Sequence, residues 1–191
     1  MRVQVYTIGH STRTLDELLA LLRAHGVRTL ADIRSIRRSR TNPQFDEPAL
    51  REALGRRYAV IDELGGRRGK PKQPPRLAND GWDHPSFRNY ADHALTAGFR
   101  AGLTRLLRLP GPVAILCAEA VWWRCHRRIV ADHLLARGVS VAHILSERPA
   151  APATLTPFAV VSRGRVHYPR RERGESGSVP RRGADDRRST R

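Results

Sequence analysis

Short apolar segments of strand length alternate with segments of helical periodicity along this chain, and this alternation constrains the fold more than any other feature. We expect strands over residues 3–8, 29–33, 58–61, 113–116 and 139–145. Leucines and alanines at helical spacing fill the intervals between them. Strands that are joined through helices form parallel sheets with helices on both faces. The sequence therefore predicts an α/β fold with a Rossmann-like, doubly wound, mostly parallel five-stranded sheet.

Residues that cap or break helices set the expected helix boundaries. Thr14 and Glu17 form a capping box, in which each side chain satisfies a free backbone donor, and Gly26 ends that helix. Apolar residues at helical spacing over 87–107 predict further helix, which we interpret as core packing. A helix over 124–137 is expected after the fourth strand.

Composition divides the chain into three regions. Residues 1–147 are expected to form the α/β domain, and residues 148–168 a linker with an appended β-hairpin, because Ser162-Arg163-Gly164 separates two short apolar runs. Residues 169–191 are rich in Arg, Gly and Ser, so we predict a basic, disordered tail that cannot bury enough apolar surface to fold.

A glycine- and proline-rich segment over residues 63–75 interrupts the alternation. A loop of this length in a compact domain is a lid, a binding loop or partly disordered. Gly69-Lys70 is not part of a phosphate-binding P-loop, because Pro71 follows it and the upstream glycine spacing is wrong.

The chain is strongly basic, with a formal net charge of +17, and only Lys70 and Lys72 are lysines. Arginine binds phosphate through a planar fork of donors, so the charge favours a phosphate-bearing ligand or a nucleic acid as partner. A GC-rich genome would produce the same bias without any such function. The oligomeric state and any cofactor are left open.

The number of cysteines and the N-terminal residues predict the cellular location of the protein. The chain has two cysteines, and Met1-Arg-Val-Gln-Val5 leads directly into a strand without an apolar signal segment. We therefore expect a cytoplasmic protein with reduced thiols. No apolar run approaches membrane-spanning length, so no membrane association is expected.

The segment Val113–Arg128 has the highest concentration of chemically reactive side chains in the sequence. It holds both cysteines, Cys117 and Cys125, together with a carboxylate, an imidazole and three arginines. It runs from the end of a strand into the start of a helix, which is where α/β sheets bind ligands. In the expected strand order 3-2-1-4-5, the first and fourth strands are neighbours. His10 and Ser11 would then lie beside Cys117.

Five short motifs together resemble a known family. They are Gly9-His10-Ser11, Asp32-Ile33-Arg34, Leu64-Gly65-Gly66-Arg67, Cys117-Ala118-Glu119 and Cys125-His126-Arg127. In order and spacing they resemble a bacterial and archaeal family known as domain of unknown function 488, over roughly residues 3–168. The family typically has a proline soon after the Asp-x-Arg motif, whereas Pro43 comes late here. The resemblance implies that these positions form a shared site, and it implies no reaction.

Cys125 is the better candidate nucleophile of the two cysteines. A helix start and the flanking Arg124, His126 and Arg127 favour its thiolate, although a free cysteine also packs well as a small apolar residue. Cys117 ends a buried strand, and its role would be that of a resolving thiol or a metal ligand. Zinc binding by Cys117, Cys125 and His126, with His10 as a further candidate ligand, is an alternative, although the cysteine spacing lacks the usual Cys-x2-Cys knuckle.

The other polar residues also have two interpretations. Asp32 and Arg34 project from the same face of a strand and form either an ion pair or an anion clamp. Trp122 and Trp123 either stack on bases or pack as a lid.

The resulting hypothesis is a cysteine-dependent enzyme acting on a phosphorylated, nucleotide or nucleic-acid substrate. Its rivals are a non-catalytic nucleic-acid-binding module and a small zinc-binding protein. No residue is assigned to a metal. The candidate catalytic residues are Cys125, Cys117, His10 and Glu119, and the candidate substrate-binding residues are Ser11, Asp32, Arg34, Arg67, Arg124, His126 and Arg127.

Overall fold

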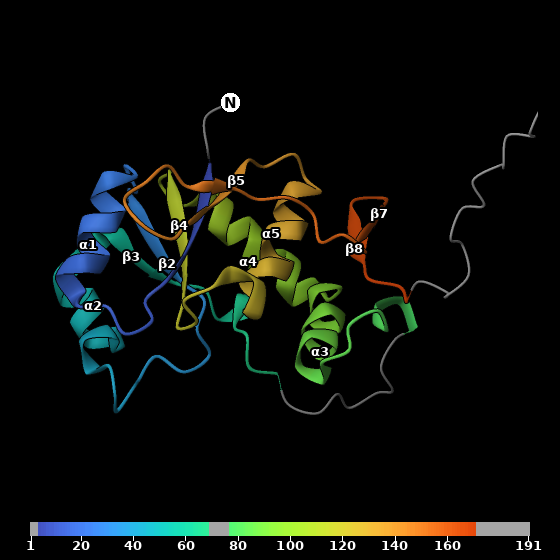
Figure 1. The fold of residues 1–191 in the computed structure, drawn as a ribbon, viewed down its shortest axis with the longest axis horizontal. Helices are drawn as coiled ribbons and strands as arrows, with labels where there is room; N and C mark the ends of the chain where they lie inside the picture. Colours follow the sequence, from blue (N-terminus) through green and yellow to red (C-terminus); the bar gives the residue numbers. More distant parts are fainter. Residues whose placement is uncertain (1–3, 69–76, 171–191) are drawn as a thin grey trace, which may run out of the picture.

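The computed structural model describes residues 4–68 and 77–170, and a six-stranded sheet runs through its middle (Figure 1). Its strands are β1 (Val5–Gly9), β2 (Thr29–Asp32), β3 (Tyr58–Val60), β4 (Val113–Cys117), β5 (Val141–Ile144) and β6 (Ala151–Pro152). The first five are parallel to their neighbours, and β6 pairs antiparallel with β5. The predicted α/β class and mostly parallel sheet are confirmed.

The strand order is β3-β2-β4-β1-β5-β6, so the expected order 3-2-1-4-5 is wrong in the middle. The expected β1–β4 pairing is present, but β4 also pairs with β2 and takes the central position. All five residues of β4 are buried, which suits a central strand. In this register Gly9 lies opposite Cys117, and Asp32 lies opposite Leu116. The ends of β1, β4 and β2 are thus contiguous.

Helices cover both faces of the sheet. They are α1 (Leu15–Ala24), α2 (Glu47–Leu54), α3 (Pro85–Ala94), α4 (Ala97–Arg108) and α5 (Arg127–Leu135). One core joins α1 and α2 to strand residues such as Ile8, Leu30 and Leu116. The other joins α3, α4 and α5 to the alternate strand residues, such as Val5 and Ile115. Figure 1 shows the two groups of helices on opposite sides of the sheet.

The helical region expected over residues 87–107 is two helices, because Thr96 caps the start of α4 by accepting a hydrogen bond from the Phe99 amide. The helix expected from Arg124 begins three residues later, at Arg127. Short 3₁₀ turns complete the elements: η1 (Pro43–Phe45), η2 (Gly55–Arg57), η3 (Asp62–Leu64), η4 (Leu77–Asn79) and η5 (Trp122–Arg124).

The C-terminal hairpin is confirmed as β7 (Val160–Ser162) and β8 (Arg165–His167). Arg163 and Gly164 connect the two strands, with φ of 49° and 69°, as a two-residue hairpin turn requires. The predicted linker also supplies β6, so the sheet has six strands and not the expected five. The basic tail beyond Arg170 and residues 69–76 of the expected long loop lie outside the described residues.

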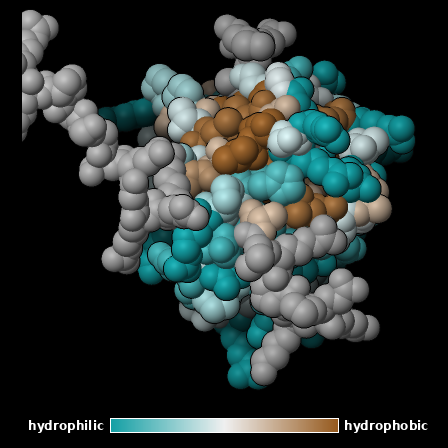
Figure 2. All heavy atoms as spheres, turned by 90° about the vertical axis from the view of Figure 1, so that its right-hand side faces the viewer, coloured by the Kyte–Doolittle hydropathy of each residue, from teal (hydrophilic) through white to brown (hydrophobic). Residues whose placement is uncertain are grey.

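The surface near the hairpin is mixed in character. Val160 and Val161 of β7 are exposed. Figure 2 faces this end of the molecule, where apolar side chains form a patch among hydrophilic ones. Over residues 4–68 and 77–170, no helix combines the length and apolar character needed to cross a bilayer.

Candidate functional site

The two cysteines and His126 meet at the carboxyl end of β4. Cys117 is the last residue of β4, and the following loop turns back through η5 so that Cys125 precedes α5. His126 Nδ1 lies 3.6 Å from Cys125 Sγ and 3.8 Å from Cys117 Sγ, and the three atoms lie within 4.8 Å of one another. Both cysteines are free thiols. We call these three residues the sulfur centre.

A buried arginine contacts the sulfur centre. Arg127 is 1 % exposed, and its Nε donates to Cys125 Sγ at 3.3 Å. Its Nη2 donates to the Glu119 carbonyl and thereby fixes the loop between the cysteines. Burial alone would raise the pKa of Cys125, but the Cys117 thiol, His126 and Arg127 together lower that pKa well below its usual value.

Cys117 has the opposite protonation preference. Its hydrogen bond to Cys125, followed by burial, raises the pKa of Cys117 well above its usual value. When the pair loses one proton, that proton leaves Cys125, because Cys125 has the lower pKa of the two. A thiolate rather than a thiol is the nucleophile in cysteine chemistry.

Two glycines of the motifs allow the chain to approach this centre. A Cβ at Gly66 would lie 2.3 Å from His126 Nδ1, so a larger residue would displace the imidazole. A Cβ at Gly9 would lie 1.8 Å from the Glu119 carbonyl oxygen. Glycine is therefore required at both positions because of close packing and not because of backbone conformation.

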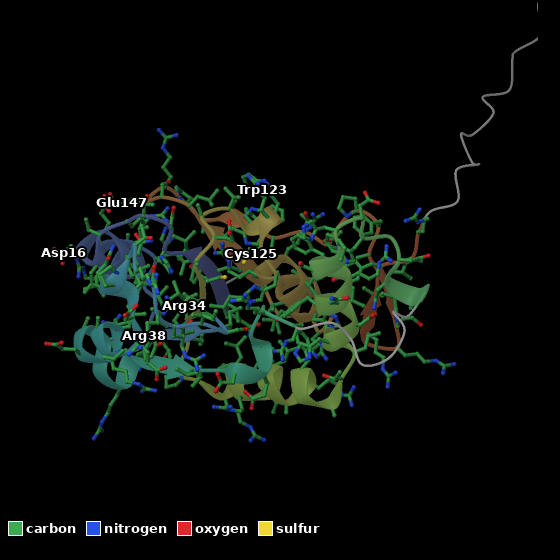
Figure 3. All side chains as sticks on the ribbon, turned by 90° about the horizontal axis from the view of Figure 1, so that it is seen from below. Asp16, Arg34, Arg38, Trp123, Cys125 and Glu147 are labelled. Carbon is green, nitrogen blue, oxygen red and sulfur yellow. The ribbon has the colours of Figure 1, made fainter. Side chains whose placement is uncertain are left out.

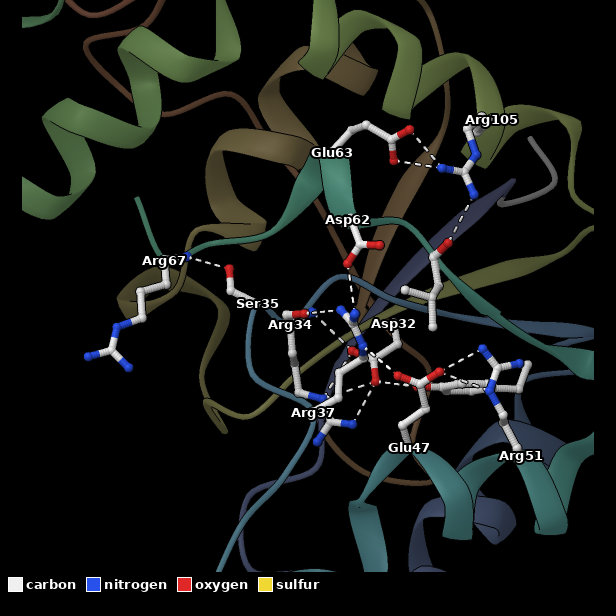
Figure 4. A network of polar contacts seen from close by, with 12 residues as sticks. Asp32, Arg34, Ser35, Arg37, Glu47, Arg51, Asp62, Glu63, Arg67 and Arg105 are labelled. Atoms are coloured by element: carbon white, nitrogen blue, oxygen red, sulfur yellow. Dashed lines mark hydrogen bonds and ion pairs between the residues drawn. The ribbon is translucent and has the colours of Figure 1, made fainter. Parts of the chain in front are cut away.

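On the other face of the sheet, Asp32 and Arg34 form a buried ion pair. Arg34 Nη2 donates to Asp32 Oδ2 at 2.6 Å, and Nε donates to Oδ1 at 3.0 Å. The Tyr58 hydroxyl also donates to Asp32 Oδ2, at 2.7 Å. The expected shared face is confirmed, and these two side chains neutralise each other. Figure 4 shows the wider network of polar contacts around them.

His10 packs against this ion pair and not against the sulfurs. Its Nδ1 donates to the Ser11 carbonyl at 2.9 Å, so the Nε2 lone pair faces Arg34 Nη1 at 3.3 Å. Its ring stacks on Phe45 at 4.4 Å. Burial, and then the charge of Arg34, lower the pKa of His10. The imidazole is therefore neutral and acts as an acceptor for Arg34.

Three adjoining hollows follow the carboxyl edge of the sheet, and together we call them the groove. The sulfur hollow, about 410 Å³, is lined by the sulfur centre with Tyr90, Phe87, Trp123 and Arg124. The central hollow, about 540 Å³, adds Arg34, Ile36, Arg67 and Arg68. The His10 hollow, about 410 Å³, adds Ser11, Arg38 and Asn42. Glu119 lines all three.

Most of the expected site residues line this groove. Cys117, Cys125, His126, Glu119 and Arg124 line the sulfur hollow. In the other two hollows lie Arg34, Arg67, His10 and Ser11. Asp32 and Arg127 line none of the three, since both are buried behind other groups. Figure 3 shows Trp123, Cys125, Arg34 and Arg38 in a row across the molecule.

Helix α3 contributes residues that the sequence pattern did not identify as functional. Tyr90 is buried, its ring lies 4.9 Å from that of His126, and its hydroxyl donates to the Leu64 carbonyl at 2.7 Å. Phe87 and Ser86 also line the sulfur hollow. Their helical spacing matches that of core residues, so periodicity alone could not separate the two roles.

Trp122 and Trp123 have different environments. Trp122 stacks on His143 with a ring separation of 4.2 Å, and His143 Nδ1 lies 2.8 Å from Thr7 Oγ1, which anchors η5 to the sheet. Trp123 is 47 % exposed and borders the sulfur hollow. Only the second tryptophan is therefore available to a ligand.

The sulfur centre also has the donor set of a soft metal ion. A tetrahedral zinc ion places its sulfur and nitrogen ligands about 3.6 Å apart, as its bond lengths of about 2.3 and 2.05 Å dictate. The separations of 3.6 and 3.8 Å from His126 Nδ1 to the two sulfurs fit that geometry. The three residues would leave a fourth position toward the groove.

Fold and site together define an α/β domain with paired cysteines at the carboxyl edge of a mostly parallel sheet. Residues 14–134 match the family model described as domain of unknown function DUF488, and the chain belongs to this family. The match includes four of the five motifs, while Gly9-His10-Ser11 and the C-terminal hairpin lie outside it. Among curated proteins and solved structures, none matches the chain.

Proposed function

We propose that this protein is an enzyme that acts on a phosphate-bearing substrate, with Cys125 as its nucleophile. The observation that carries the proposal is the sulfur centre itself, in which Cys125 accepts a hydrogen bond from Arg127, lies beside Cys117 and borders an arginine-lined groove. Ligands of doubly wound α/β sheets bind at this edge. A reduced thiol pair also favours a cytoplasmic location.

The chemistry would proceed in two balanced steps. The Cys125 thiolate forms a bond to an electrophilic atom of the substrate, and the leaving group departs with the electrons of the broken bond and takes a proton from Cys117. Water then displaces the sulfur, its oxygen bonds to the substrate atom, one of its protons returns to Cys117, and Cys125 is again a thiolate. Arg67 and Arg124 would hold the phosphate, while His10 would position Arg34, because its lone pair faces that guanidinium.

Alkylation tests this assignment. We expect iodoacetamide to label Cys125 at neutral pH about tenfold faster than an ordinary cysteine, whose pKa is near 8.5. Cys125→Ser should abolish the fast labelling. Cys117→Ser, the matched control, should still be labelled at the remaining sulfur. Slow labelling of the wild-type protein, or fast labelling that survives in Cys125→Ser, would remove the nucleophile from the proposal.

A second candidate function, binding of a zinc ion by Cys117, Cys125 and His126, is favoured by the spacing of the three donor atoms. Protein purified from zinc-containing medium would then hold stoichiometric zinc by elemental analysis. Cys117→Ser should lose the metal, and His25→Ala, which changes a histidine remote from the centre, should retain it. Stoichiometric zinc together with blocked alkylation would favour this candidate over the nucleophile.

A further inference from the structure

Each hollow of the groove contains an exposed arginine whose charge is not neutralised. These are Arg124 in the sulfur hollow, Arg67 in the central hollow and Arg38 in the His10 hollow. Within residues 4–68 and 77–170 none of the three forms an ion pair. In Figure 4 the Arg67 guanidinium points away from the paired residues.

Neighbouring arginines, by contrast, contact carboxylates or backbone carbonyl groups of the protein. Arg34 is paired with Asp32, and Arg37 contacts both Glu47 and Asp62, at 2.9 and 2.8 Å. Arg68 donates to backbone carbonyl groups of residues 62, 63 and 65. Asp32, Glu47 and Asp62 therefore neutralise structural arginines, and Arg38, Arg67 and Arg124 remain without an ion-pair partner among the described residues.

We propose that the groove binds single-stranded nucleic acid, with one backbone phosphate at each of the three free arginines. This inference rests on the proposed function and names its substrate class. The phosphates of a mononucleotide are all at one end of the molecule and would contact one of these arginines. A nucleic-acid strand carries one phosphate per nucleotide along its length and could contact all three. Three adjoining hollows with one free arginine in each match the repeating polymer.

Apolar side chains alternate with these cations and provide surfaces for bases. Trp123 and Ile36 are 47 % and 53 % exposed, although both side chains are large and apolar. Trp123 borders the sulfur hollow, and Ile36 lines both the central and the His10 hollow. The stacked pair Trp122–His143 holds the turn that presents Trp123. Exposed rings beside a cationic track are the usual means of binding unpaired bases.

Glu119 is the one carboxylate that lines the three hollows. Its oxygens can accept a hydrogen bond from the amino group of a base. A base would therefore lie beside Glu119 at the sulfur centre, next to the backbone phosphate that Arg124 binds. A duplex keeps its bases paired and stacked, so it would not fill the hollows in this way.

Binding of fluorescein-labelled oligonucleotides tests this inference on the full chain. Wild-type protein should bind short single-stranded DNA or RNA more tightly than the matching duplex or a mononucleotide. Arg38→Ala, Arg67→Ala and Arg124→Ala should each weaken binding and reduce the slope of log affinity against log salt by about 0.7. Arg108→Ala removes the same charge from an exposed site on α4, and it should leave the slope unchanged.

Several outcomes would overturn the inference. These are equal binding of duplex and single strand, equal binding of a mononucleotide, or groove variants that behave like Arg108→Ala. The proposed function fails separately, in the alkylation experiment. Fast alkylation without binding of a nucleic-acid strand would support an enzyme that acts on a small phosphorylated substrate. Strand binding without fast alkylation leaves a non-catalytic nucleic-acid-binding module.

Discussion

Arg127 places a buried guanidinium directly against Cys125 and adds to the lowering of its pKa by Cys117 and His126. It is the single guanidinium hydrogen-bonded to that sulfur among the described residues, and it is buried. We expect Arg127→Met to raise the pKa of Cys125, because a cation beside a thiolate favours the charged form. The alkylation rate at about pH 6 should fall about tenfold, the equivalent of one pKa unit.

The matched control for this variant is Arg128→Met. Arg128 is adjacent in sequence, but its Nε donates to Thr156 Oγ1 and its guanidinium lies over the Trp82 ring. Its loss should leave the pH profile of alkylation unchanged. Parallel changes in the two variants would mean that the Arg127 effect is structural and not electrostatic.

Gly66→Ala tests the close approach to His126. The added methyl group would lie well inside the contact distance of the imidazole, so His126 should move away from the two sulfurs. Gly98→Ala, in α4, meets nothing closer than 3.9 Å and should stabilise the protein by about 0.5–1 kcal/mol. Histidine and cysteine NMR shifts, with chemical denaturation, measure both effects. An unmoved His126 signal in Gly66→Ala would contradict the prediction.

Residue chemistry could be predicted from the sequence better than residue contacts. The motifs identified Cys125, His126 and Arg127 as neighbours in one site, and the ion pair of Asp32 with Arg34 followed from strand alternation. His10 was expected beside Cys117 with Arg34 close by, and it contacts Arg34 although β4 lies between β1 and β2. The motif at residues 64–67 included Gly66, but its close approach to His126 could not be predicted, since a glycine needed for packing looks like any loop glycine.

At the scale of elements, His143 of β5 stacks on Trp122 and so holds the turn η5. Burial, and then the charge of Arg127, lower the pKa of His143 from 6.5 to about 4. The unfolded chain therefore binds more protons than the folded one between these values, so stability falls as the pH drops through this window. At about pH 5 the loss from His143 alone is about 2 kcal/mol.

Urea unfolding at neutral pH and at about pH 5 measures this effect. His143→Gln removes one titrating group and should reduce the fall in unfolding free energy between neutral pH and about pH 5, while buried His133, whose pKa is lowered to about 3, retains its share. His25→Gln alters a partly exposed histidine and should retain the wild-type dependence. An equally steep loss in His143→Gln would assign the acid sensitivity to another group.

Element boundaries follow local signals, and this explains which of them were predicted correctly. The capping box at Thr14 and Glu17 is present, with Glu17 Oε2 accepting from the Thr14 amide at 2.6 Å. The division of α3 from α4 was missed, because the apolar stripe continues across the break. The start of α5 was placed three residues early, because Arg124 and Cys125 belong to a turn that lacks any capping signal.

At the scale of the whole molecule, a buried carboxylate attaches the C-terminal segment to the domain. Asp132 of α5 accepts hydrogen bonds from the Tyr168 hydroxyl at 2.8 Å and the Thr156 amide at 2.9 Å. Tyr168→Phe removes one donor and should lower the unfolding free energy by about 1–3 kcal/mol. Tyr6→Phe, at a partly exposed tyrosine, should change it little. Equal values for both variants in urea unfolding would contradict this role.

The sheet class followed from the alternation of elements, whereas the strand order did not. Strands β1, β2 and β4 are each buried on both faces, so their apolar runs are interchangeable in a sequence pattern. Side-chain packing between the helices decides which of them lies in the middle. The groove was nevertheless anticipated, because any order that pairs β1 with β4 brings His10–Ser11 and Cys117 to the same edge.

The central position of β4 has a consequence for the durability of the sulfur centre. A strand with neighbours on both edges and helices on both faces exchanges its amide hydrogens with solvent only when the entire domain opens. Cys117 is the last residue of that strand, so its separation from Cys125 would require the same rare event. Deuterium uptake at residues 113–117 should therefore be among the slowest in the protein.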